Sequence, residues 1–90
     1  MGLISKSENG WELFRISDKS LSCENSKLNG DDIDHIEKIL KPEFGDRMKK
    51  ETVFVSYDNW SGVFIMSIAK RKTKDTDALI KEIFEFLSVK

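Results

Sequence analysis

Residues 51–69, ETVFVSYDNWSGVFIMSIA, decide the fold of this 90-residue chain. Two runs rich in β-branched and aromatic residues make up most of the stretch, and such side chains favour strands over helices. The runs are separated by residues 58–62, DNWSG, whose Asn and Gly tolerate the positive φ of a tight turn. The stretch therefore predicts a β-hairpin with these facing pairs: Tyr57 and Val63, Val55 and Ile65, Val53 and Ser67.

Both faces of this hairpin are apolar. Because side chains alternate along a strand, one face carries Val53, Val55, Tyr57, Val63 and Ile65. The other face carries the bulkier Phe54, Phe64, Met66 and Ile68, with Thr52 and Ser56. A small antiparallel sheet usually buries one face and exposes the other. We expect helices to cover the bulkier face, which leaves the face of Tyr57 open to a partner.

The N-terminal residues predict a second hairpin around Asn9-Gly10, a strong turn signal. A two-residue turn there places Leu3 opposite Ile16 and Ser5 opposite Phe14. In that register the core receives Leu3, Phe14 and Ile16, while Trp11 and Leu13 lie on the other face. Residues 20–24 alternate apolar and polar side chains, which is compatible with a short, half-buried third strand.

Two amphipathic helices are predicted from apolar residues at helical spacing. The first opens at Asp31 and Asp32, carries the stripe Ile33, Ile36, Ile39 and Leu40, and is expected to stop at Pro42. Residues 43–50 then form a charged connector. The second helix is expected to be capped by Asp75 or Thr76 and to bury Leu79, Ile80, Ile83, Phe84, Phe86 and Leu87.

The order of elements is β-β-(β)-α-β-β-α. It predicts one α+β domain over residues 1–90: a two-layer sandwich in which an antiparallel sheet of four to five strands carries two helices on one face. Two helices cannot easily cover both faces of such a sheet. The uncovered apolar face is therefore the main functional clue, since such patches on small proteins usually mark interfaces.

Composition narrows the function classes. The chain has 39% hydrophobic and 34% charged residues with a formal net charge of −1, which is typical of a folded soluble protein without a strong demand for polyanions. The single Cys23 fits a reducing cytoplasm, and the sequence shows no secretory signal or membrane span. His35 and Cys23 have no companions that would make a metal or nucleophilic site. We expect no enzyme activity and no cofactor.

Two hypotheses for function follow. The first is a protein-interaction module, either a homodimer or an inhibitor resembling immunity proteins, whose contact residues are Trp11, Leu13, Val55, Tyr57, Trp60, Val63 and Ile65. Trp60 is singled out because an exposed turn tryptophan either folds back on the sheet or anchors a partner. The alternative is nucleic-acid binding through a basic cluster: Lys49, Lys50, Lys70, Arg71, Lys72 and Lys74.

Overall fold

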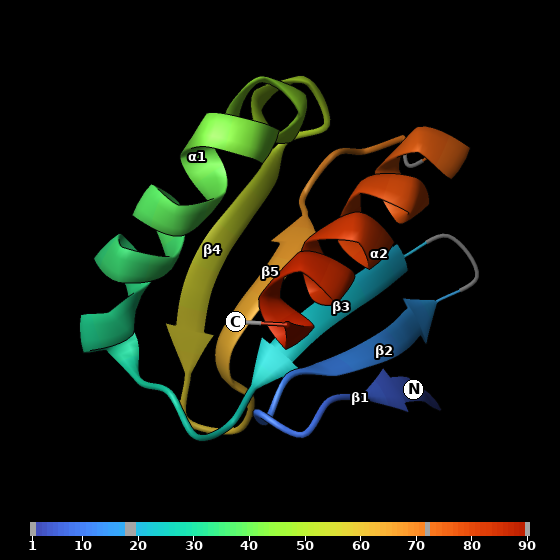
Figure 1. Cartoon of the computed structure of the whole chain (residues 1–90). Coiled ribbons are helices and arrows are strands. Elements are labelled where there is room, and N and C mark those ends of the chain that lie inside the picture. The colour runs from blue at the N-terminus through green and yellow to red at the C-terminus, as the bar shows by residue number, and fades with distance from the viewer. Residues whose placement is uncertain (1, 18–19, 72, 90) are drawn as a thin grey trace.

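A computed structural model describes residues 2–17, 20–71 and 73–89 and confirms the α+β sandwich. The five strands form one antiparallel sheet in the order β1-β2-β3-β5-β4. Both helices lie on the same side of this sheet, α1 over β4 and α2 over β3 (Figure 1). The elements are β1 (Gly2–Lys6), β2 (Glu12–Ser17), β3 (Ser20–Asn25), a short 3-10 turn η1 (Gly30–Asp32), α1 (Ile33–Lys50), β4 (Val53–Asp58), β5 (Gly62–Ser67) and α2 (Lys74–Ser88).

The central hairpin, β4 and β5, has the predicted register. Val53 pairs with Ser67, Val55 with Ile65, and Tyr57 with Val63. Its turn is fixed by local chemistry, because one Asp58 carboxylate oxygen accepts the N–H groups of Trp60 at 2.8 Å and Ser61 at 2.6 Å. Gly62 has a φ of +75°, and a Cβ there would lie 2.3 Å from the Asn25 carbonyl oxygen. Only glycine fits where β5 begins against β3.

The helices cover the face of Val63 and Ile65, so the predicted choice of face is wrong. Both side chains are fully buried, as is Cys23 on the neighbouring strand. The reason is the distribution of side-chain volume between the helix layer and the sheet. The helices contribute the bulky side chains, among them Leu40, Phe44, Ile80, Ile83 and Phe84. Small and β-branched residues therefore fit best on the facing strands, because close packing alternates large and small partners.

The first hairpin is shifted from its predicted register. Lys6 pairs with Glu12 and Leu3 pairs with Phe14, with a bulge between them. Asn9 in the connecting loop donates a hydrogen bond to the Leu87 carbonyl at 2.8 Å. Asn25 donates one to the Asn9 carbonyl at 3.4 Å. These tertiary contacts favour a longer loop, closed by a 2.8 Å bond from the Ser7 N–H to the Trp11 carbonyl.

The helices cover the face of this hairpin opposite to the one predicted. Leu3 and Phe14 share a face, as predicted, but it is the face turned away from the helices. Trp11 and Leu13, each 4% exposed, lie on the covered face and enter the core beneath α2. Leu3 and Ile16 are 51% and 38% exposed, so the prediction that they build the core is wrong.

Helix α1 continues through Pro42 to Lys50, eight residues beyond the predicted stop. Proline removes one backbone N–H and disfavours the interior of a helix by about 3 kcal/mol. Phe44 lies two residues further on and is buried, on the same stripe as Ile36 and Leu40. Burying such a side chain contributes about 1.5–3 kcal/mol, so packing offsets the penalty of the proline.

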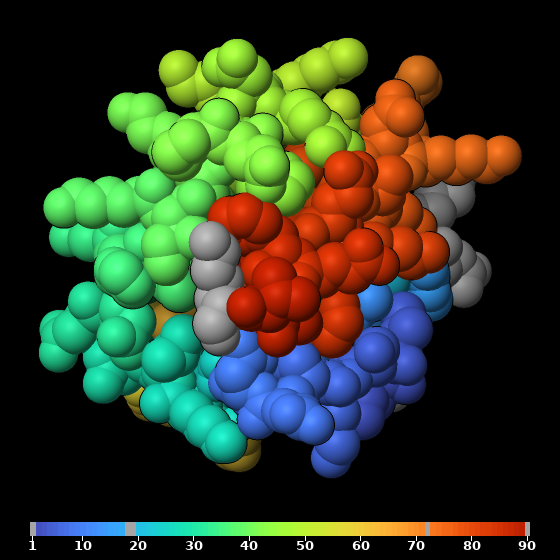
Figure 2. All heavy atoms as spheres, in the orientation of Figure 1, coloured from blue at the N-terminus to red at the C-terminus, as the bar shows by residue number. Residues whose placement is uncertain are grey.

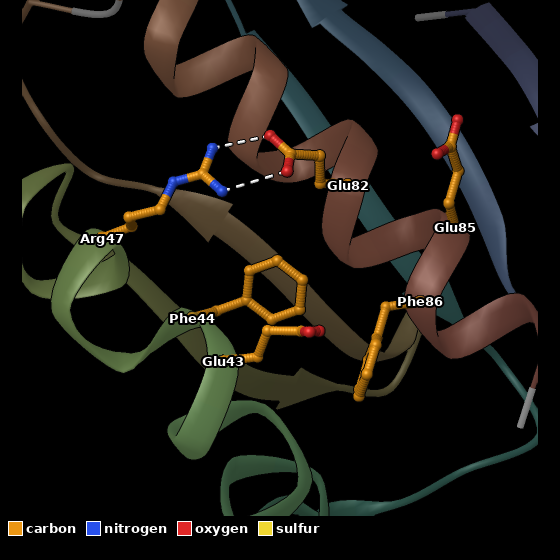
Figure 3. Close-up of a pocket in the computed structure, with 6 residues that line it drawn as sticks. All are labelled: Glu43, Phe44, Arg47, Glu82, Glu85 and Phe86. Atoms are coloured by element: carbon orange, nitrogen blue, oxygen red, sulfur yellow. Dashed lines mark hydrogen bonds and ion pairs between the residues drawn. The ribbon is translucent and has the colours of Figure 1, made fainter.

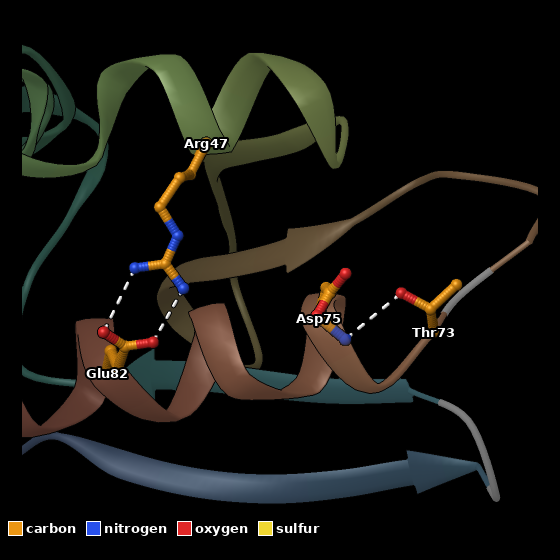
Figure 4. Close-up of polar contacts among 4 residues, drawn as sticks. All are labelled: Arg47, Thr73, Asp75 and Glu82. Carbon is orange, nitrogen blue, oxygen red and sulfur yellow. Dashed lines mark hydrogen bonds and ion pairs between the residues drawn. The ribbon is translucent and has the colours of Figure 1, made fainter.

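Two further elements differ from the prediction, β3 in its burial and α2 in its capping residue. β3, predicted as a half-buried strand, is the central strand and is almost wholly buried. Helix α2 is capped by Thr73, whose hydroxyl oxygen accepts the Asp75 N–H at 3.2 Å (Figure 4). Thr76 completes the box by accepting the Thr73 N–H and donates its own hydroxyl to a Glu51 carboxylate oxygen at 2.8 Å. The start of α2 is thereby tied to the end of α1.

Candidate functional site

The side of the sheet turned away from both helices is here called the open face. Its centre is a row of five residues that are successive cross-strand partners, one from each strand: Leu3, Phe14, Ser22, Met66 and Phe54. Partners in an antiparallel sheet point to the same side, so their side chains form a continuous band. Four of the five are apolar. The band runs from one edge of the sheet to the other.

Neighbouring rows extend this apolar band. Phe64, the partner of Ser56, meets Phe54 edge-to-face with ring centroids 6.1 Å apart. Ile68 follows Met66 along the chain and is 62% exposed. The aromatic rings and Met66 are half-buried by one another although no helix lies over them. The open face is thus an apolar surface partly closed by its own side chains.

Ser22 lies at the centre of the band. It is fully buried between the partners Phe14 and Met66, and its hydroxyl has no hydrogen-bond partner among residues 2–17, 20–71 and 73–89. A buried hydroxyl without a partner is unfavourable by about 1–3 kcal/mol. The middle of the open face therefore holds an unused polar atom beneath its larger neighbours.

The two ends of the strands differ in charge. At one end of the open face, Glu12 and Glu24 are direct cross-strand partners, with Lys6 on the far side of Glu12 and Asp58 closing β4. At the other end of the strands, Lys70 and Arg71 lie in the connection from β5 to α2 and are exposed. Like charges opposite one another on a sheet repel. Lys6, as the other neighbour of Glu12, offsets part of the repulsion between the two glutamates.

The basic cluster gathers at the second of these ends. The end of α1, the start of β4, the end of β5 and the start of α2 all lie together there, at the top of Figure 1. Long side chains project from this end in Figure 2, from the last turn of α1 and from the segment leading into α2. The structure thus brings together Lys49, Lys50, Lys70, Arg71 and Lys74. Lys72 lies outside the described residues.

The predicted contact residues of the first hypothesis are divided by the structure. Trp11, Leu13, Val63 and Ile65 are core residues and lie beneath the helices. Val55 is half-buried and packs against the same core. Tyr57 is 39% exposed on the helix-covered side. Only Trp60 remains a prominent surface feature. The residues of the apolar band are ones that the sequence predicts for the core. Alternation along the strands identifies them as one face of the sheet, but it does not show which face the helices cover.

Trp60 projects from the tip of the central hairpin and is 93% exposed. It therefore does not fold back over the sheet. Its backbone is held by the Asp58 carboxylate, so the indole is presented on a fixed turn. Trp is among the residues most enriched at the energetic centres of protein interfaces. A rigidly presented, solvent-exposed tryptophan is consistent with a contact role.

A groove of about 420 Å³ separates the two helices and is lined by Glu43, Phe44, Arg47, Glu82, Glu85 and Phe86 (Figure 3). Its floor is the edge-to-face contact of Phe44 with Phe86, whose ring centroids are 5.3 Å apart. Arg47 spans it with two hydrogen bonds to the Glu82 carboxylate, at 3.1 and 2.7 Å. This pairing raises the pKa of Arg47 and lowers the pKa of Glu82. The Arg47–Glu82 ion pair thus joins the two helices across the groove, and Glu43 and Glu85 add two further carboxylates to its lining.

The candidate reactive residues do not assemble into a catalytic group. Cys23 is fully buried, and burial raises the pKa of its thiol, with a further contribution from the charge of Glu24. His35 is exposed on α1. Within the described parts of the chain, no set of three or more His, Cys, Asp or Glu residues is arranged to hold a metal ion. Neither described helix has the length and apolar character needed to cross a membrane.

Comparison of the chain with models of protein families, with characterised proteins and with solved structures gave no match.

Proposed function

We propose that this protein is a non-enzymatic protein-interaction module that binds its partner through the open face of the sheet. The observation that carries the proposal is the cross-strand band of Leu3, Phe14, Met66 and Phe54, which both helices leave uncovered. Extended apolar surfaces of this kind on small folded proteins are typical of binding sites. This replaces the surface predicted from sequence by the opposite side of the same sheet.

The chemistry of the open face favours a protein surface over a small molecule. The band is broad and shallow, whereas small-molecule sites are concave and enclose most of the ligand surface. Apolar side chains in its middle and charged residues at its ends give the apolar centre and polar rim of a protein interface. A buried, reduced Cys23 agrees with a reducing compartment, so we place this interaction in the cytoplasm.

Methyl NMR tests the proposal directly. Methyl groups of Leu3, Met66 and Ile68 report on the open face, while those of Leu79 and Ile83 report on the core. We expect the open-face signals to shift or broaden with protein concentration or on addition of extract from the cells that make the protein. The core signals should stay in place. Unchanged open-face signals under both conditions would refute the proposed interaction surface.

Nucleic-acid binding is the second candidate, favoured by one specific observation. The fold brings the basic end of α1 beside the basic loop after β5, although these segments are about 20 residues apart in sequence. Acidic groups temper the cluster, because Glu51 directly follows Lys50 and Asp75 directly follows Lys74. Binding of a single-stranded oligonucleotide that falls steeply with salt would support it. Salt-independent or undetectable binding would exclude it.

A further inference from the structure

We propose that the outer edge of β4 is a second binding site, where an extended segment of another protein joins the sheet as an additional strand alongside α1. β4 is the last strand in the order β1-β2-β3-β5-β4, so only one of its sides is paired within the described residues. An extended peptide can add to such an edge through main-chain hydrogen bonds. This site is separate from the open face and does not depend on the function proposed for it.

The backbone groups of β4 that face outward belong to Val53, Val55 and Tyr57. The Ile68 N–H donates to the Thr52 carbonyl at 3.0 Å, which makes these two residues a hydrogen-bonded pair of the central hairpin. Bonded and non-bonded pairs alternate along an antiparallel ladder, so every second residue from Thr52 onward bonds to β5. The residues between them direct their N–H and C=O groups away from β5. The edge therefore presents a line of alternating donors and acceptors to an incoming strand.

The edge of β4 lacks the features that protect the other edge of the sheet. β1 has a bulge between Leu3 and Ser5 and ends in Lys6. Bulges, prolines and lysines are common devices that prevent an exposed edge from pairing with another chain. β4 pairs with β5 in an unbroken register and contains neither proline nor lysine. Of the two edges, β4 is therefore the one suited to receive a strand.

A groove of about 450 Å³ lies beside this edge, on the flank of α1. Its lining includes Gly45 and Met48 of α1 and Val53 at the start of β4. The groove between the two helices is lined by other residues of α1, so this second groove lies on the flank turned away from α2. In Figure 1, α1 lies along β4 at the outer side of the sheet. Every second side chain of a strand added to β4 would point toward this groove.

Gly45 keeps the middle of the groove free of a side chain. Glycine within a helix is unfavourable relative to alanine. A Cβ at this position would contact only the Lys41 Cγ, at 3.4 Å, so the packing of the described residues does not require a glycine. The residue is half-buried and lines the groove. The absent side chain leaves room for one from an added strand, which gives this glycine a role in binding.

The charges along α1 define the segment that fits. α1 runs antiparallel to β4, since it ends just before β4 begins and starts near Tyr57, whose ring would lie 3.9 Å from a Cβ on Gly30. Glu37 therefore lies toward the end of β4 and Lys49 toward its start, with Asp46 offsetting part of the positive charge. Antiparallel pairing is the more stable arrangement. The complementary segment then has a basic residue first, β-branched residues in the middle and an acidic residue last.

A backbone NMR titration with the peptide Thr-Arg-Thr-Val-Thr-Val-Thr-Glu tests this site. In the antiparallel register its Arg, both Val and its Glu face α1, and the two valines pair with Val55 and Val53. We expect the amide signals of Val53, Val55 and Tyr57 to shift, while those of Leu3 and Phe14 stay in place. No shift on β4 at about millimolar peptide, where even a weak complex forms, would overturn the proposal.

N-methylated peptides separate strand addition from other modes of binding. Methylation of the two valine nitrogens removes N–H groups that face β4, and it should raise Kd by at least about tenfold. The N–H groups of the threonines that precede the valines point away from β4, so methylation there should leave Kd within about threefold. Equal losses for both peptides would contradict a main-chain ladder. Exchange of Arg and Glu should raise Kd by about fivefold at low ionic strength.

A protein variant tests the role of the groove. Gly45→Leu fills the groove and should raise the peptide Kd by at least about tenfold, while urea unfolding shows that the fold is retained. Leu3→Asp, on the open face at the opposite edge of the sheet, is the control and should leave Kd unchanged. Binding that survives Gly45→Leu would overturn the groove as part of the site.

The outcomes keep this site apart from the open face and from self-association. If the peptide does not bind while the open-face methyl signals respond to cell extract, this site is refuted and the proposed function stands. If the peptide binds while the open-face signals never change, the reverse holds. Shifts of the β4 amides with protein concentration alone would assign the edge to a second copy and overturn a foreign segment as its occupant.

Discussion

Single residues fix the turns and the strand register of this sheet. Gly62 permits β5 to start against the Asn25 carbonyl, and Asp58 holds the turn that precedes it. Asn9 and Asn25 tie the first loop to the body of the protein, which sets the register of β2. Each of these residues acts through backbone geometry. None is apolar, yet together they set which residues become cross-strand partners.

Gly62→Ala should destabilise the protein strongly. The added Cβ would meet the Asn25 carbonyl oxygen at 2.3 Å in a backbone with φ of +75°. We expect a loss of about 2–4 kcal/mol in the free energy of unfolding, measured with urea. Gly45→Ala is the control within α1, where a Cβ would have only the Lys41 side chain nearby, at 3.4 Å. It should stabilise by about 0.5–1 kcal/mol. Equal effects of the two changes would contradict this account of Gly62.

Cys23 should be chemically silent in the folded protein. Its thiol is fully buried on β3, and its pKa is raised, so little thiolate is available at neutral pH. We expect a disulfide reagent to react only at the rate of global unfolding and to react fully in denaturant. Rapid modification under native conditions would show that the core over β3 opens locally.

At the scale of elements, local sequence predicts a structure well where the turn chemistry is local. Both strands of the central hairpin and their register follow from residues 51–69 alone. The N-terminal hairpin is different, because its loop is held by Leu87 and Asn25, which are remote in sequence. The extension of α1 beyond Pro42 depends likewise on a core site for Phe44. These features are tertiary, so patterns within one segment do not reveal them.

The candidate site shows the same limit. The existence of one uncovered apolar face follows from two helices and five strands. Which face is covered depends on the bulk that the helices bring, and the strand sequences alone do not reveal it. Trp60 is the one predicted contact residue whose strong exposure agrees with the role assigned to it. The cross-strand band, by contrast, can be recognised only from the register of all five strands.

Pro42→Ala should stabilise α1. The change restores a backbone N–H within the helix and removes the ring from an exposed position. We expect the free energy of unfolding to rise by about 1–3 kcal/mol, which is at most the full helix penalty of proline. Chemical denaturation measures it, with Lys41→Ala as the control at the neighbouring exposed site. A loss of stability would mean that α1 needs the proline for its shape.

The Arg47–Glu82 ion pair between the helices makes a small contribution to stability that depends on pH. Its hydrogen bonds lower the pKa of Glu82, so its stabilisation is complete above the pKa of an unfolded glutamate. It is lost as the pH falls through the lowered pKa of the folded state. Glu82→Gln should therefore reduce the difference in unfolding free energy between neutral and acidic solution. An unchanged difference would show that solvent screens the pair completely.

At the scale of the whole molecule, the structure is a sheet with one face sealed by helices and one face left apolar. Phe14, Phe54, Phe64 and Met66 on that second face are half-buried, so a bound partner would complete their burial.

The most direct test of the open face as an association surface is the molar mass of three proteins measured by sedimentation equilibrium. The chain has a mass of 10.4 kDa, so a dimer has twice that mass, 20.8 kDa. Ile68→Asp puts a charge on the open face at a position 62% exposed, and Val89→Asp puts one at a position 83% exposed elsewhere. If the partner is a second copy, we predict 20.8 kDa for the natural chain and Val89→Asp, and 10.4 kDa for Ile68→Asp. The same mass for both variants would contradict the account.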